Sequence, residues 1–166
     1  MSSSEKNERH CTGIFIYKFN ELKKEYEVAL VQSEKFRHHS TGELLWTIPG
    51  GRIEPEDVGD TLEKRIIACA MREGREELRS EIQDVRYYPE LNKKRKGAEI
   101  GYKDPEMQFY FYECVGKAVS DELKPGDDVI RICWYSLSQI QLLNMAEDVK
   151  GLLQEILTHT EKYFMK

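Results

Sequence analysis

Hydrophobic and polar positions alternate over several short segments of the chain, which is the pattern expected of strands. A charged segment at 20–24 separates the first two and predicts a hairpin loop, and a short helix is expected at 136–140. The predicted strands are 13–18, 27–32, 44–48, 85–88, 107–115 and 129–135. Together with the helices, they indicate an α+β or α/β sandwich with a mixed sheet between helices.

Two longer segments have apolar residues at helical spacing. The first is predicted to begin with Asp60 or Thr61 as its N-cap and to end near Leu78. Gly74 within it costs about 1 kcal/mol relative to alanine, so we expect close contact with the sheet there. The second spans 147–163. The residues expected to face the sheet are Ile67, Ala70, Met71, Gly74 and Leu78 in the first helix and Val149, Leu152, Leu153, Ile156 and Leu157 in the second.

Length and composition narrow the class of protein. With 166 residues, 40% hydrophobic and 33% charged, the chain fits a flexible N-terminus at 1–10 and a single domain at 11–166. A net charge of -5 argues against a nucleic-acid polymer as partner, and no apolar run is long enough for a membrane span. The polar start and four widely spaced cysteines predict a reducing, cytoplasmic location.

Three glutamates near the end of the first helix share one of its faces. At about 100 degrees per residue, Glu76 and Glu77 lie on either side of Glu73 and within about 60 degrees of it. Like charges at this spacing destabilise a helix by about 0.2–0.5 kcal/mol per pair. A hard divalent cation would compensate, and carboxylate oxygens suit Mg²⁺ or Mn²⁺.

An alternative is that this face is solvated surface, neutralised by Arg72, Arg75 and Arg79 without any metal. The sequence before the helix favours a functional site. The segment 45–51 is an apolar run that ends in Gly50 and Gly51, residues that allow a backbone to turn sharply or to approach a ligand.

A strand, a glycine pair and an acidic helix in this order resemble the Nudix hydrolase superfamily. Its motif is written G-x5-E-x7-R-E-U-x-E-E-x-G-U, where U is a bulky aliphatic residue. The residues that match it are Gly51, Arg72, Glu73, Glu76 and Glu77. The resemblance extends from about Thr12 through 134–137 and implies a Nudix fold, an α/β/α sandwich with a mixed β-sheet packed between helices.

The same resemblance implies the chemistry of the site. Glu73, Glu76 and Glu77 would be the ligands of Mg²⁺ or Mn²⁺, with Glu76 also catalytic. Arg72 would be a second catalytic residue that orients the cluster, and the glycine pair would contact substrate. The expected reaction is metal-assisted attack of water on phosphorus, which cleaves a diphosphate linkage in a nucleoside diphosphate joined to another group.

The chain departs from the family motif in its spacing. Gly51 and Arg72 are separated by 20 residues, about seven more than the motif has. Counting forward from Gly51 places the isolated glutamate at Asp57, beside Glu56, whereas counting back from Arg72 gives the position next to Glu63. Seven residues are about 1.94 helical turns, so we expect the insertion to lengthen the helix and to rotate its metal face by only about 20 degrees.

A carboxylate outside the helix is expected to activate or hold the attacking water. We expect it to be Glu122, which resembles the glutamate three residues before a proline that mutator-type nucleoside triphosphatases of this family use near their metal. The alternative is an ordinary exposed loop acid, and Asp128 is the second choice. The other candidates are Asp104, Glu106, Glu113, Asp121 and Asp127.

A basic run at 92–97 has two interpretations, a solvated loop or a flexible clamp in which Lys94 and Arg95 bind substrate phosphates. The segment 37–39 contains two adjacent histidines that would point to opposite sides of a strand. We therefore expect a polar loop there, in which His39 could touch substrate.

The function expected is a divalent-metal-dependent pyrophosphohydrolase whose partner is a phosphorylated nucleotide derivative. The alternative is a non-catalytic Nudix-like nucleotide-binding or sensor module, motivated by the altered spacing and by Arg79-Ser80 in place of the closing residues of the motif. An adaptor acting through the basic run is a third idea. The sequence leaves the oligomeric state open, with a homodimer as one option.

Overall fold

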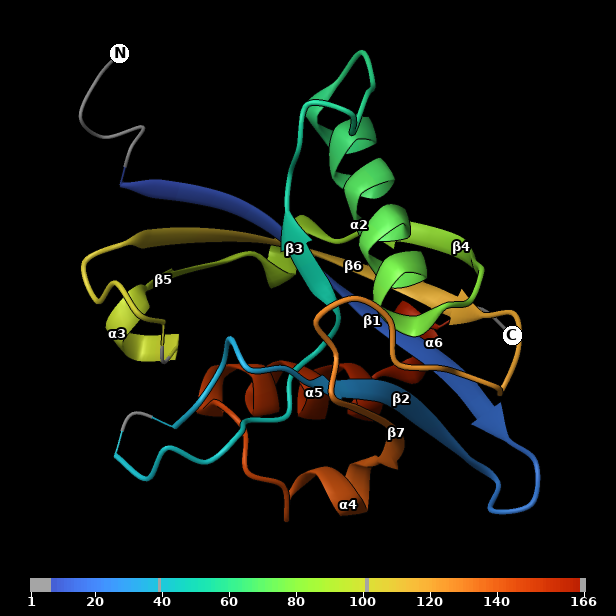
Figure 1. The fold of residues 1–166 in the computed structure, drawn as a ribbon. Coiled ribbons are helices and arrows are strands. Elements are labelled where there is room, and N and C mark those ends of the chain that lie inside the picture. Colours follow the sequence, from blue (N-terminus) through green and yellow to red (C-terminus); the bar gives the residue numbers. More distant parts are fainter. Residues whose placement is uncertain (1–6, 39, 101, 165–166) are drawn as a thin grey trace.

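The computed structural model describes residues 7–38, 40–100 and 102–164 and places them in a mixed sheet flanked by helices (Figure 1). The strands are β1 (Glu8–Asn20), β2 (Glu25–Gln32), β3 (Gly50–Arg52), β4 (Ile82–Tyr87), β5 (Lys93–Lys96), β6 (Gln108–Ala118) and β7 (Arg131–Ser136). The main path of the sheet is β4-β6-β1-β2-β7, with β3 paired to β1 and β5 paired to β6. Because β1 is parallel to β6 and antiparallel to β2, the sheet is mixed, as predicted.

Helices cover both faces of this sheet (Figure 1). They are α2 (Leu62–Leu78), α3 (Gly97–Ile100), α4 (Leu137–Ile140), α5 (Glu147–Thr158), α6 (Thr160–Tyr163) and the 3₁₀ helix η1 (Pro89–Leu91). α2 packs on one face, and α5 packs on the other. This arrangement confirms the α/β/α sandwich.

The central strand β1 divides the core into two layers through the alternation of its side chains. Ile14 and Ile16 belong to the apolar cluster that includes residues of α2. Phe15 and Tyr17 belong to the cluster that includes residues of α5. The prediction for α5 is close to what is observed, since Val149, Leu153, Ile156 and Leu157 are buried there.

Helix α2 begins where the sequence predicted. Thr61 is its N-cap, and its side-chain oxygen accepts a hydrogen bond from Lys64 N at 3.2 Å. A helix that begins at Leu62 confirms that much of the insertion is helical. A Cβ atom at Gly74 would lie 2.1 Å from Ile82 Cδ1 of β4, which explains the glycine. The buried face is Ile66, Cys69, Ala70, Gly74 and Leu78, whereas Ile67 and Met71, which were also expected to face the sheet, are only partly buried.

The C-terminus of α2 is closed by the loop between β6 and β7. Lys124 N donates to Leu78 O at 3.1 Å and Gly126 N donates to Glu77 O at 2.8 Å. A Cβ atom at Gly126 would lie 1.7 Å from Glu76 O, so the loop backbone contacts the helix end directly. These bonds satisfy carbonyl groups that a helix end leaves without partners.

Three predicted elements differ in the structure. The segment 44–48 forms isolated bridges through Leu44, Trp46 and Thr47 instead of a continuous strand, because its partners belong to three different segments. The helix expected at 147–163 is interrupted at His159, whose φ of -118° is not helical. Glu8 to His10 belong to β1 instead of a flexible tail, since they pair with β6, whereas residues 1–6 and His39 lie outside the described residues.

Candidate active site

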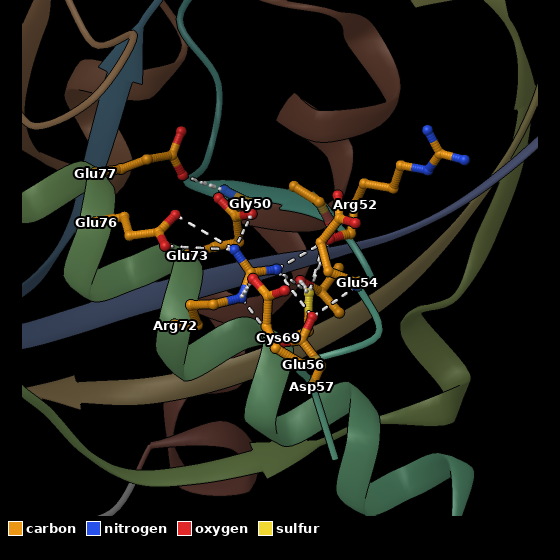
Figure 2. Close-up of polar contacts among 12 residues, drawn as sticks. Gly50, Arg52, Glu54, Glu56, Asp57, Cys69, Arg72, Glu73, Glu76 and Glu77 are labelled. Atoms are coloured by element: carbon orange, nitrogen blue, oxygen red, sulfur yellow. Dashed lines mark hydrogen bonds and ion pairs between the residues drawn. The ribbon is translucent and has the colours of Figure 1, made fainter.

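The carboxylate of Glu77 is partly buried and lies beside the backbone of Gly50 (Figure 2). The Gly50 backbone N–H donates to Glu77 Oε2 at 2.7 Å. Burial raises the pKa of Glu77 to about 8, and the charges of Glu73 and Glu76 act in the same direction against the hydrogen bond from Gly50. A cation beside this group would favour its ionised form.

Glu73 lies one turn earlier and contacts the second glycine. A Cβ atom at Gly51 would lie 2.4 Å from the carboxyl carbon of Glu73, and one at Gly50 would lie 2.1 Å from Thr12 O in β1. Both glycines are therefore required where β3 packs between β1 and the carboxylates of α2. Burial raises the pKa of Glu73, and the positive charge of Arg72 opposes the shift.

The guanidinium of Arg72 makes a two-pronged ion pair with Asp57. Arg72 Nε donates to Asp57 Oδ1 at 2.7 Å and Nη2 donates to Oδ2 at 2.8 Å. Asp57 is 2% exposed and also accepts a hydrogen bond from Glu54 N at 2.8 Å. Burial alone would raise the pKa of Asp57, but these hydrogen bonds hold it below its ordinary value.

Arg72 also reaches the acidic face of α2 (Figure 2). Its Nη1 donates to Glu73 Oε1 at 3.0 Å and to Glu76 Oε2 at 3.3 Å. Arg75 and Arg79 do not join it, because their ion pairs are with Glu81 and Asp127. Among the described residues Glu77 has no ion pair, so the arginines neutralise the face only in part. We call Glu73, Glu76 and Glu77, with Arg72 and Asp57, the acidic cluster.

The three acids considered for the position of the isolated glutamate of the motif lie at different distances from Arg72. Asp57, which the count forward from Gly51 gives, holds Arg72, and Glu56 Oε1 lies 3.8 Å from Arg72 Nε. Glu63 is in the first turn of α2, nine residues or about 13 Å along the axis from Arg72. Of the three, Asp57 is the one that binds Arg72 through two hydrogen bonds.

The carboxylates of the acidic cluster are the kind of ligand that a hard cation prefers, but in this structure they do not converge on one point. Carboxylates offer the oxygen ligands that Mg²⁺ and Mn²⁺ prefer, and Mg²⁺ is usually held by only one or two of them together with substrate phosphates. Within the part of the chain that is described, no group of three or more His, Cys, Asp or Glu side chains is arranged to hold a metal. The Glu76 side chain is 44% exposed and is turned toward Arg72.

Glu122 and Asp128, the two loop acids preferred for a role outside the helix, have different surroundings. Glu122 is exposed, and its described hydrogen bond is from its own N to Ser120 Oγ at 3.1 Å. No hydrogen bond or ion pair between described residues joins it to the acidic cluster. Asp128 forms an ion pair with Lys35 at 3.4 Å. The positive charge of Lys35 opposes the upward pKa shifts that burial causes in Glu73 and Glu77. Sequence reasoning missed Lys35, which is remote in the chain and belongs to no motif.

The basic run is not the loop that the sequence predicted, because it forms β5 at the edge of β6. Alternation along the strand gives its side chains different environments. Lys94 Nζ lies 5.3 Å from the centre of the Tyr110 ring. Arg95 Nε donates to Asp148 Oδ2 of α5 at 3.1 Å, so this guanidinium already has a partner in the protein.

Comparison with known proteins gives one family. The model of the NUDIX domain matches residues 9–156. The NUDIX domain of Shewanella oneidensis NrtR, solved with ADP ribose, superposes with a TM-score of 0.67 at 16% identity, covering 96% of this chain and 99% of that one. For a C. elegans Ap4A hydrolase the TM-score is 0.65 at 15% identity, covering 93% and 99%.

A Nudix hydrolase from M. smegmatis, RenU, has a TM-score of 0.62 at 16% identity, covering 96% of this chain and 90% of that one. No curated protein matches the chain. None of the helices within residues 7–38, 40–100 and 102–164 is both long and apolar enough to cross a membrane.

Proposed function

This chain belongs to the Nudix family, and we propose that it is a divalent-metal-dependent hydrolase that cleaves the diphosphate linkage of a nucleotide derivative. The observation that supports this proposal is the pair of partly buried carboxylates, Glu73 and Glu77, that contact the backbone of the glycine pair and whose pKa values are raised there. Burial of acids with incomplete compensation costs free energy, and such groups are concentrated at functional sites.

We assign the residues of the acidic cluster the following roles. Glu73, Glu76 and Glu77 would hold Mg²⁺ or Mn²⁺, which when bound neutralises phosphate charge and lowers the pKa of a bound water. The Gly50 N–H fixes the orientation of Glu77. Asp57 fixes Arg72, and Arg72 in turn orients Glu73 and Glu76.

Proton transfer from the attacking water requires a group that solvent and substrate can reach. Glu76 and Glu122 are both exposed, and we propose them for this step, with Asp128 as the second choice to Glu122. Carboxylates on loops can approach a reacting group when the substrate binds, so the present distance of Glu122 from the cluster does not exclude it.

The substrate class follows from the family and from the residues around the site. The named neighbours bind ADP ribose or hydrolyse Ap4A, and we propose a substrate of the same general kind, a nucleoside joined through a diphosphate to a second group. The glycine pair would contact its phosphates. Lys94 and Arg95, in the middle of β5, are proposed to bind phosphate, and Arg95 would give up its hydrogen bond to Asp148 when phosphate binds.

A second candidate is a nucleotide-binding module without catalysis. The observation in its favour is that the described residues contain no preformed group of metal ligands. It predicts nucleotide binding without turnover at any metal concentration.

Turnover separates the two candidates. Nucleotide-sugars, dinucleotides and triphosphates are incubated with the full chain in Mg²⁺, Mn²⁺ or EDTA, and the release of nucleotide and phosphate is measured. We expect metal-dependent release that Glu76→Gln abolishes and that the matched variant Glu81→Gln, in an exposed acid paired with Arg75, leaves unchanged. Binding without release in any metal would contradict the hydrolase.

A further inference from the structure

Two buried cysteines lie between α2 and the sheet and have different surroundings. Cys69, in α2, and Cys114, in β6, are both 0% exposed. The thiol of Cys114 packs in an apolar cluster and has no hydrogen bond among the described residues, as expected of a buried thiol that behaves as a small apolar group. Cys69 lies instead among polar groups, one helical turn before Arg72 (Figure 2).

The sulfur of Cys69 contacts three parts of the chain. Thr12 Oγ1 in β1 lies 3.2 Å from it, and the carbonyl oxygens of Gly51 and Arg52 in β3 lie 3.8 and 3.5 Å from it. Arg72 Nη2 is 3.8 Å away, and the same nitrogen donates to Arg52 O at 3.1 Å. Burial raises the pKa of Cys69 to about 12, so the thiol keeps its proton and can donate. Strands β1 and β3 and the guanidinium of Arg72 therefore meet at this sulfur.

The hydroxyl of Thr12 is out of keeping with its position in the central strand. Thr12 is 2% exposed and shares a face of β1 with Ile14 and Ile16, which belong to the apolar core. A buried hydroxyl costs free energy unless it has a hydrogen bond, and a valine would have the same shape. Among the described groups, the side-chain partner of this hydroxyl is Cys69 Sγ. Two polar side chains are therefore paired at positions where apolar residues would also pack.

We propose that Thr12 and Cys69 form a positioning pair that holds the backbone of β3, just beyond the glycine pair, against the guanidinium of Arg72. Asp57 binds this guanidinium through Nε and Nη2. The carbonyl of Arg52, which the thiol also contacts, accepts a further hydrogen bond from Nη2. The pair therefore supplies a second fixed point for Arg72, on a strand instead of on the loop that carries Asp57.

The consequence concerns the acids that Arg72 orients. Its Nη1 donates to Glu73 and Glu76, so a guanidinium that is less well held lets both carboxylates move. Small displacements of such groups lower a reaction rate even when the residue that was changed touches no substrate. The inference rests on the proposed function only for this effect on turnover, because the contacts of the pair lie within the protein.

Hydrogen exchange at Arg72 tests the pair without turnover. The Nε proton is observed by heteronuclear NMR of the full chain in EDTA and is identified by its absence in Arg72→Lys. Since Nε donates to the buried carboxylate of Asp57, we expect slow exchange with water in the wild type. In Cys69→Ala and in Thr12→Val the exchange is expected to be about fivefold faster, as for the loss of one weak hydrogen bond.

Cys114→Ala is the matched control, because it also removes a buried sulfur but no hydrogen bond among the described residues. Both cysteine variants leave a cavity of similar size, so their losses of stability in urea should be similar. We expect Cys114→Ala to keep the wild-type exchange at Arg72. Thr12→Val removes a hydroxyl without leaving a cavity, so it gives the same test where Cys69→Ala does not fold.

Steady-state hydrolysis gives the second measurement. Cys69→Ala and Thr12→Val are expected to lower kcat by about fivefold and to leave KM unchanged, because the pair orients other groups and binds no substrate. Since both changes remove the same contact, the double variant should have a kcat no lower than the poorer single variant. Cys114→Ala is expected to keep the wild-type kcat.

An exchange rate at Arg72 that neither variant changes would overturn the positioning pair, and so would an equal acceleration in Cys114→Ala. The two proposals fail separately. A chain in which the variants speed exchange at Arg72 but that hydrolyses nothing contradicts only the hydrolase. A chain that hydrolyses nucleotides with equal kcat in the wild type, Cys69→Ala and Thr12→Val contradicts only the positioning pair.

Discussion

The acidic cluster and a second charged group, formed by Lys93, Glu113 and Asp148 and called here the cavity cluster, both contain a buried carboxylate, but they compensate the charge differently. In the acidic cluster Glu77 accepts a hydrogen bond from Gly50, and Arg72 is fixed by two hydrogen bonds to Asp57. In the cavity cluster the lysine lies 3.7 Å from Glu113, and neither oxygen of that carboxylate has a hydrogen bond among the described groups. Short hydrogen bonds therefore fix the geometry of the acidic cluster, whereas the cavity cluster depends on longer charge–charge contacts in the interior.

The largest expected effect is on turnover through the acidic cluster. In the Glu76→Gln, Glu77→Gln double variant we expect kcat to fall by at least about a hundredfold, because two oxygen donors of the metal site become amides. The measurement is steady-state hydrolysis of the best substrate in Mg²⁺, with circular dichroism to check the fold. Full activity in this variant would show that the cluster does not hold the catalytic metal.

The second effect is on stability and compares the ion pairs of the two clusters. Asp57→Asn removes the buried carboxylate that binds Arg72 through two hydrogen bonds and leaves the guanidinium only Glu73 and Glu76, and breaking a buried pair in this way costs about 3 kcal/mol. Asp148→Asn is the counterpart in the cavity cluster and should cost less, because Lys93 keeps Glu113 nearby. Urea unfolding gives both values, and an equal loss would show that the two clusters are equally dependent on charge pairing.

A third effect concerns an acid that belongs to neither cluster. Glu122→Gln is expected to lower kcat by about a hundredfold and to flatten the acidic limb of the pH–rate profile, as loss of a general base does. Asp128→Asn is measured beside it. If Glu122→Gln changes neither quantity while Asp128→Asn abolishes turnover, the role belongs to the residue paired with Lys35.

The fourth effect is the pH dependence of stability without metal. Folded Glu77 has a pKa of about 8 against roughly 4.3 when unfolded, so between these values the folded state binds more protons. The free energy of unfolding in EDTA should therefore fall as pH rises from about 4.5 to about 8. Glu73 and Glu113 act in the same direction, so Glu77→Gln should reduce the slope without removing it.

Urea unfolding at several pH values in EDTA gives this slope. Glu27→Gln is the control and should keep the wild-type slope. Addition of Mg²⁺ should stabilise the wild type most at the upper end of the range, where ionised Glu77 would gain a partner. A slope that Glu77→Gln leaves unchanged would contradict the burial of this carboxylate.

The acidic cluster could be predicted from the sequence to the extent that it depends on local spacing. Helical periodicity alone places Glu73, Glu76 and Glu77 on one face of α2. The partner of Arg72 could not be chosen, because Asp57, Glu56 and Glu63 are all acids at nearby positions, and only the path of the loop before the helix decides between them.

The cavity cluster could not be predicted from local spacing in the sequence. Lys93, Glu113 and Asp148 come from β5, β6 and α5, and only the pairing of β5 with β6 and the packing of α5 bring them together. The basic run has the composition of a solvated loop, but edge pairing with an aromatic strand makes it a strand. The predictions for 13–18, 27–32 and 107–115 succeeded because alternation and β-branched or aromatic residues agree there with the sheet.

The extra helical turns before the acidic cluster bear on how this domain could evolve. The added length enters between Asp57 and Arg72, at the end of α2 that carries exposed Leu62, while the other end is tied to the loop through Gly126 (Figure 1). Changes in length near two helical turns preserve the rotation of the glutamate face, whereas a change of two residues would turn it by about 160 degrees. Insertions or deletions of about two helical turns at the N-terminal end of α2 would therefore change the surface there and keep the orientation of Glu73, Glu76 and Glu77.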